Sequence, residues 1–204
     1  MMAKPEIGSA VVVDVPATTA NLGPGFDCLG AALDLSNRFQ LTVLEGGAER
    51  FELIIESEEG SHLRGGPDNL VYRAAQRVWR EIGMPPVALE ARVHLAVPPA
   101  RGLGSSATAI VAGLMGANAL AGEALGKEKL LELAIDIEGH PDNVVPSLLG
   151  GLCLTAQAAS RRWRVVRCEW HAEVQAVVAI PSIRLSTADA RRAMPKHIVI
   201  PDAV

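Results

Sequence analysis

Residues 98–108, PPARGLGSSAT, form a glycine-rich loop between a segment typical of a strand and one typical of a buried helix. Residues 87–97 alternate apolar and polar side chains, which predicts a half-buried strand that runs into the loop. After the loop, the pattern predicts a helix to about Leu120 that is capped by Ser105 or Ser106. Such a loop can hold an anion, because glycines let backbone N–H groups converge and the helix start adds its dipole.

Other interpretations of this loop exist. GLGSSA fits the dinucleotide pattern GxGxxA, but the second strand ending in an acid that this fold requires does not follow. A mononucleotide phosphate loop would end in GK[ST], and the loop contains no lysine. Neither standard nucleotide-binding pattern is therefore present in full. Two interpretations stay open: an anion-binding loop of another kind, and a plain turn before a Ser-capped core helix.

Composition excludes several classes of partner. The chain has 204 residues, a net charge of −4 and 3% aromatic residues, so neither a basic face nor a base-stacking surface is expected for nucleic acid. Cys28, Cys153 and Cys168 are odd in number and lack metal-ligand spacing, which indicates reduced thiols in the cytoplasm. Residues 102–122 are uncharged over the length of a membrane span, but their many Gly, Ala, Ser and Thr residues favour a buried helix and no membrane partner.

The rest of the pattern predicts an α+β fold with a mixed, partly antiparallel sheet. Helices are predicted at 68–82, 105–120, 127–138 and from Thr187. Strands are predicted at 10–15 (ending at Pro16), 37–44, 51–56, 87–97, 150–155, 164–168 and 174–180. A domain change is expected near residues 168–174, and the remainder is too short for a second domain, which predicts a partial chain.

Two further motifs carry polar residues. PATTANLGPGFDCLGAAL (16–33) places an amide and a carboxylate after the first strand, where substrate groups are often found, although a capped Pro/Gly turn would look the same. In IEGHPDNVVPSLLGG (137–151), Glu138 stands in the last turn of a helix, where the macrodipole disfavours an acid by up to about 1 kcal/mol. A cation such as Mg²⁺ beside Glu138 would reverse that cost; a solvated helix end, and a capping or packed His140, are the alternatives.

Together, the three motifs resemble the small-molecule kinase superfamily named after galactokinase, homoserine kinase, mevalonate kinase and phosphomevalonate kinase. The first and third motifs, and PSIRLSTADARRAMP at 181–195, are similar specifically to the homoserine kinases. The resemblance implies that residues 1–168 form an N-terminal ATP- and substrate-binding kinase domain. It also implies that residues 169–204 begin an incomplete C-terminal α+β sandwich domain, with the family's third glycine-rich motif beyond Val204.

The same resemblance implies a cytoplasmic transferase of threonine biosynthesis that phosphorylates the side-chain hydroxyl of L-homoserine with ATP and Mg²⁺. Ser106 (or Ser105) and Glu138 would hold the metal, and Asn143 would orient the hydroxyl without a general base. The expected ATP-binding residues are Pro98, Pro99, Ala100, Arg101, Gly102, Leu103, Gly104, Ser105, Ser106, Ala107, Thr108 and Asn69. The expected substrate-binding residues are Asn21, Asp27, His140, Asn143, Thr187 and Arg191. A mevalonate- or sugar-type kinase and an inactive nucleotide-binding fragment are the alternatives, and a homodimer is left open.

Overall fold

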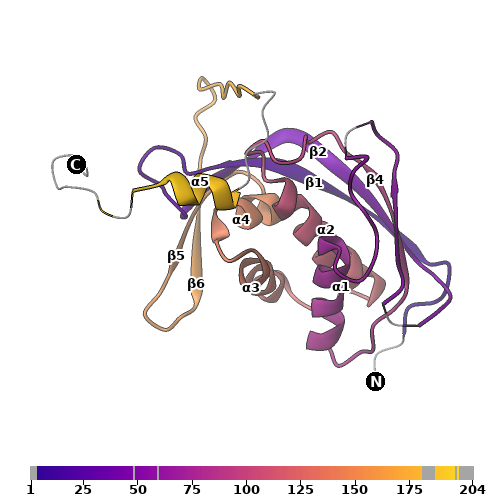
Figure 1. Ribbon diagram of the computed structural model, residues 1–204. Coiled ribbons are helices and arrows are strands. Elements are labelled where there is room, and N and C mark those ends of the chain that lie inside the picture. The colour runs from indigo at the N-terminus through magenta and orange to yellow at the C-terminus, as the bar shows by residue number, and fades with distance from the viewer. Residues whose placement is uncertain (1–3, 48, 59, 181–186, 196, 198–204) are drawn as a thin grey trace.

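Strand β2 (Leu29–Val43) is the centre of a mixed six-stranded sheet with helices on one face (Figure 1). The computed structural model describes residues 4–47, 49–58, 60–180, 187–195 and 197. The other strands are β1 (Ala10–Ala20), β3 (Phe51–Ile55), β4 (Leu89–His94), β5 (Leu152–Gln157) and β6 (Trp163–Cys168). The helices are α1 (Leu70–Glu81), α2 (Ser105–Leu120), α3 (Lys127–Glu138), α4 (Pro141–Leu149) and α5 (Thr187–Ala193). This is the predicted α+β class.

The two edges of β2 carry different neighbours. β1 runs antiparallel along one edge, from Ala10 opposite Thr42 to Ala20 opposite Gly30. On the other edge, β4 pairs with the second half of β2, whereas β5 pairs with its first residues. β3 and β4 are parallel and are joined through α1, as a parallel pair requires a crossover. One long strand therefore holds the β3–β4 and β5–β6 halves of the sheet together.

Helices α1 to α4 cover one face of the sheet (Figure 1). Trp79, Tyr72 and Leu41 are among the largest fully buried side chains of this core. Buried and exposed side chains alternate along β4, because Ala91 and Val93 face the helices whereas His94 faces away from them and is exposed. No helix in the part of the chain that the structure describes is long and apolar enough to cross a membrane.

Some predicted element bounds were wrong. β1 continues through Pro16 to Ala20, with a register shift between Pro16 and Thr18. Proline is tolerated there because, among the described residues, β1 pairs with a strand on one side only. β2 begins at Leu29 and not at 37, and β4 ends at His94 and not at 97. Residues 174–180 form no strand and are exposed, so their apolar alternation has no sheet neighbour among the described residues.

The predicted serine cap of α2 was also wrong. The N-cap residue is Gly104, which has a left-handed backbone (φ 67°) and makes no side-chain cap bond. Ser105 and Ser106 are therefore the first two residues inside the helix. The predicted bounds of α3 are confirmed, and Gly139 after it adopts the left-handed conformation typical of a helix C-terminus (φ 89°).

Candidate active site

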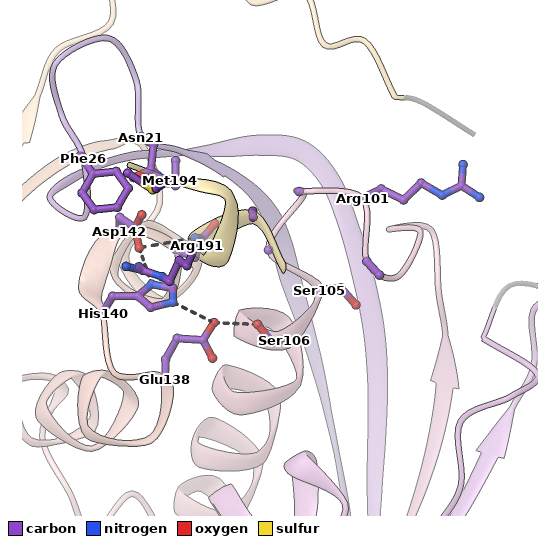
Figure 2. Close-up of a pocket in the computed structure, with 16 residues that line it drawn as sticks. Asn21, Phe26, Arg101, Ser105, Ser106, Glu138, His140, Asp142, Arg191 and Met194 are labelled. Carbon is purple, nitrogen blue, oxygen red and sulfur yellow. Dashed lines mark hydrogen bonds and ion pairs between the residues drawn. The ribbon is translucent and has the colours of Figure 1, made fainter. Parts of the chain in front are cut away.

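A cavity of about 540 Å³ lies where the end of β1, the starts of α2 and α4, the end of α3 and helix α5 meet (Figure 2). The predicted residues that line it are Asn21, Ala100, Arg101, Gly102, Gly104, Ser105, Ser106, Glu138, His140, Asn143 and Arg191. Segments from almost the whole length of the chain thus contribute to one concave surface, which is the usual form of a small-molecule site.

The glycine-rich loop forms the end of the cavity at the start of α2. Its backbone is left-handed at Ala100, Gly102 and Gly104, with φ of 58°, 73° and 67°. α4 also begins at the cavity, because His140 is its N-cap and Asn143 lies in its first turn. Two helix starts therefore direct free N–H groups and positive dipole ends toward the same space, which suits an anion.

Ser106 and Glu138 approach each other across the cavity wall. The Ser106 hydroxyl donates to Oε1 of Glu138 at 2.6 Å, although one residue begins α2 and the other ends α3. Ser105 points away from Glu138 (Figure 2). A hydroxyl and a carboxylate held this close are the hard oxygen donors that Mg²⁺ prefers, so the pair fits the ion that the family resemblance implies.

His140 is held by a buried carboxylate. Its Nδ1 lies 2.6 Å from Oδ1 of Asp142, whose side chain is only 1% exposed, and its Nε2 lies 3.9 Å from Oε1 of Glu138. Because an ionised carboxylate only accepts hydrogen bonds, Nδ1 carries the proton. The hydrogen bond that His140 donates to Asp142 is the main cause that raises the pKa of His140 above its ordinary value, while burial and Arg191 act in the opposite direction.

Asp27 and Arg191 are paired at the other end of the cavity. Nη2 of Arg191 lies 2.5 Å from Oδ1 of Asp27 and Nη1 donates to Oδ2 at 3.1 Å, a two-point fork between the β1–β2 turn and α5. The guanidinium also lies over the Phe26 ring, 5.3 Å from its centroid. Arg191 lines the cavity whereas Asp27 does not. The main-chain N–H of Asp27 donates to the Asn21 side chain, which stabilises the turn.

Asp27, His140 and Asp142 offer three possible metal-ligand atoms within 4.8 Å of one another. Arg191 already neutralises Asp27, and His140 already bonds Asp142. We therefore interpret this group as a hydrogen-bonded network and not as a cation site.

Several predicted residues lie outside the cavity lining: Pro98, Pro99, Leu103, Ala107, Thr108 and Asn69. Thr108 is fully buried, and its hydroxyl donates to the Ser105 carbonyl. Its side chain therefore stabilises the start of α2 from the protein interior. Asn69 caps α1 by accepting from the Val71 N–H. Thr187 begins α5, and its side chain lies outside the described part of the structure.

Sequence reasoning missed Phe26, Asp142 and Met194, which also line the cavity. Phe26 and Asp142 stand directly beside predicted residues within the quoted motifs. Their direction could not be derived from spacing, because both belong to short irregular segments or first turns.

Comparison with known proteins finds similar sequences. Residues 69–151 match the family model described as "GHMP kinases N terminal domain". The chain is 92% identical over 203 residues to the homoserine kinase of Synechococcus sp. (strain RCC307), a match that covers all of this chain and 65% of that protein. The chain is thus similar in sequence to the GHMP kinases, and residues 69–151 match their N-terminal domain.

Solved structures of similar proteins share the fold. The homoserine kinase from Cytophaga hutchinsonii ATCC 33406 is 28% identical with a TM-score of 0.77, over 98% of this chain and 65% of that one. A mevalonate kinase from L. major, solved with R-mevalonate, is 15% identical with a TM-score of 0.60, over 82% of this chain and 55% of that one, and supports the fold alone. The chain thus spans less than two thirds of the length of these relatives.

Proposed function

We propose that the protein uses ATP to phosphorylate the side-chain hydroxyl of L-homoserine, giving O-phospho-L-homoserine for threonine biosynthesis. One observation carries the proposal: a single cavity combines an anion-binding loop, the Ser106–Glu138 pair and Arg191, whose guanidinium is paired with the carboxylate of Asp27 beside the cavity. Homoserine is a zwitterion, so an acid for its ammonium and a guanidinium fork for its carboxylate match both of its charges. The 92% identical relative, named a homoserine kinase, supports the same substrate.

The loop of residues 98–108 and the first turn of α2 would bind the phosphates through backbone N–H groups. Ser106 and Glu138 would hold Mg²⁺, which supplies charge neutralisation for phosphoryl transfer. Asn69 would border the adenine, which remains a prediction from the family resemblance.

Asn21, His140, Asn143 and Thr187 would complete the homoserine pocket. Asn143 would orient the reacting hydroxyl. We propose no side-chain general base: Asp142 is buried and bonded to His140. The substrate hydroxyl would then lose its proton to the phosphoryl group that it accepts.

We also propose a cytoplasmic location, and residues 1–168 as the kinase domain, with 169–204 as the beginning of a C-terminal α+β domain. Arg191 and Met194 line the cavity together with residues of the first segment, so the proposed site draws on both.

The test is ATP consumption by the protein at its full natural length with L-homoserine, mevalonate and galactose. Two homoserine analogues sharpen it: 4-hydroxybutyrate lacks the ammonium and 3-aminopropanol lacks the carboxylate. We expect L-homoserine to be preferred over each analogue by at least about tenfold in kcat/KM, because each analogue leaves one charge of the Asp27–Arg191 pair unmatched. Preference for mevalonate or galactose would favour the alternative kinases, and no turnover of any of them would favour an inactive nucleotide-binding protein.

A further inference from the structure

Thr18 lies where three parts of the candidate site meet. It stands in β1 directly after the register shift at Pro16, and its side chain is fully buried. Its main-chain N–H donates to the Leu103 carbonyl of the glycine-rich loop at 3.2 Å. Its hydroxyl donates to Oδ1 of Asn143 in the first turn of α4 at 2.8 Å. Thr18 therefore contacts both the glycine-rich loop, which is proposed to bind the phosphates, and the Asn143 amide, which is proposed to orient the substrate hydroxyl.

The hydroxyl contact decides how the Asn143 amide is turned. Nδ2 of Asn143 lies 3.5 Å from Oδ1 of Asp142. An ionised carboxylate only accepts, so the NH₂ group must face Asp142 and the carbonyl oxygen must face Thr18. Because the Thr18 hydroxyl can donate, it holds that carbonyl oxygen, and the NH₂ group lies on the side of Asp142, which also lines the cavity.

We propose that Thr18 is a positioning residue, which fixes the Asn143 amide so that its NH₂ group meets the substrate hydroxyl. This inference rests on the proposed function. An amide NH₂ donates to the hydroxyl oxygen and directs the hydroxyl proton elsewhere, which agrees with transfer that needs no side-chain base. A rotated amide would offer an acceptor to the hydroxyl and turn its proton away from the phosphoryl group.

The glycine-rich loop packs against the hydrogen bond between Thr18 and Asn143. A Cβ added at Gly104 would lie 2.0 Å from Oγ1 of Thr18 and 3.1 Å from Oδ1 of Asn143. The N-cap of α2 therefore packs directly over the Thr18–Asn143 hydrogen bond. Thr18 thus contacts the glycine-rich loop through its backbone and Asn143 through its hydroxyl.

The two roles of Thr18 can be separated by mutation. Thr18→Val keeps the β-branched shape and the backbone bond to Leu103 but removes the hydroxyl. Thr18→Ser keeps the hydroxyl. Thr155→Val is the matched control, because Thr155 is also a buried strand threonine and its hydroxyl has no hydrogen-bond partner among the described residues.

In steady-state kinetics of the full-length protein with ATP and L-homoserine, we expect Thr18→Val to lower kcat by about tenfold or more and to change the KM for ATP by less than about twofold. Thr18→Ser should recover most of the loss, and Thr155→Val should behave as wild type. The inference is overturned if kcat of Thr18→Val stays within twofold of wild type, if Thr18→Ser is no better, or if the KM for ATP rises in parallel with the loss of kcat. Thr18→Ala, which adds no atoms, replaces Thr18→Val if that variant does not fold.

A second measurement does not depend on the substrate. The side-chain amide signals of Asn143 in a ¹⁵N NMR spectrum should shift in Thr18→Val and return toward wild type in Thr18→Ser, while Thr155→Val leaves them in place. In unfolding experiments, Thr18→Val and Asn143→Ala together should destabilise by less than the sum of the single changes. If wild type does not phosphorylate homoserine, the proposed function fails and these two measurements still decide the Thr18 contact; unmoved signals with additive stability changes overturn it.

Discussion

The guanidinium of Arg191 and the carboxylate of Asp27 form a two-point ion pair across 164 residues of sequence. The two groups proposed to bind the opposite charges of homoserine are thus bonded to each other in the structure. Their side chains are 40% and 34% exposed, so solvent weakens the pair and it can open at small cost. Homoserine would exchange one ion pair for two, with its ammonium beside Asp27 and its carboxylate beside Arg191.

Asp27→Asn and Arg191→Met should each raise the KM for homoserine by at least about tenfold and leave the KM for ATP nearly unchanged. Unpairing a fully buried charge costs about 2–5 kcal/mol, and the partial exposure of this pair places the effect at the low end of that range. The measurement is a steady-state titration of both substrates in each variant.

Arg192→Met is the matched control for Arg191→Met. Arg192 is the next residue on α5, is 76% exposed and pairs with Asp189. It should leave both Michaelis constants unchanged. If homoserine saturation is untouched in Asp27→Asn and Arg191→Met, the amino-acid site is misplaced and a neutral alcohol or sugar becomes the better substrate.

Glu138→Gln should reduce turnover by about a hundredfold or more while the protein stays folded, because the metal offsets charge in the transition state. Ser106→Ala should act in the same direction. Asp136→Asn, on the same helix and 60% exposed in a long ion pair with Arg77, should have little effect. Turnover measured over a range of Mg²⁺ concentrations checks this, and a drop of only a few-fold would mean that Glu138 is an ordinary helix-end acid.

Much of the fold could be predicted from the periodicity of apolar residues and from residues typical of helix ends. The apolar periodicity predicted helices at 68–82 and 127–138, where the structure has α1 and α3. The motifs also predicted residues that the structure brings to one cavity, including Asn21, Glu138, Asn143 and Arg191. The helix predictions succeeded because helices depend on local sequence. The site residues could be grouped because the family resemblance implies that the motifs form one site, which their spacing in the sequence does not show.

What could not be predicted depends on long-range contacts. The 174–180 segment has strand alternation, yet a strand needs a neighbour, and the described structure gives it none. Ser106 was expected to cap its own helix, whereas its hydroxyl bonds Glu138 on α3. Thr18 carries no pattern of its own, because its role depends on Leu103 and Asn143, which lie far along the chain.

Gly104→Val should abolish measurable ATP binding. The added Cβ would meet Thr18 and not only the phosphates, and the backbone at φ 67° strains any residue with a side chain. Gly102→Ala is the comparison: Gly102 is also left-handed but has open space around its Cβ position, so only backbone strain of about 1 kcal/mol is expected. Calorimetry of ATP binding checks both variants. Unchanged ATP affinity in a folded Gly104→Val protein would contradict the phosphate-loop interpretation.

Cys153 should resist alkylation in the native protein. Its side chain is 1% exposed, and burial raises the pKa of its thiol. The folded state therefore binds this proton more tightly than the unfolded state, so the stabilising contribution is complete below the unfolded pKa of about 8.5 and is lost as pH rises through the folded pKa. Iodoacetamide at pH 8 should modify Cys153 much faster in urea than in buffer, as mass spectrometry of the labelled peptides can measure. Equal rates would contradict the buried position.

The crossing of α1 and α2 offers a test of the fold itself. A Cβ at Gly113 would lie 2.2 Å from the Val71 carbonyl oxygen and 2.8 Å from the Ala74 Cβ, so the two helices touch at a position where no side chain fits. Gly113→Ala should lower the free energy of unfolding by about 1–3 kcal/mol, as overpacking of a dense core does, despite the better helix propensity of alanine. Gly47→Ala is the control, because Gly47 is exposed in a turn with no atom near its Cβ position, and the change should stay within about 0.5 kcal/mol. Urea unfolding of the three proteins measures the difference. A Gly113→Ala protein as stable as wild type would mean that α1 and α2 do not cross at this distance, and since α2 starts at the cavity, the position of Ser106 would then be in question as well.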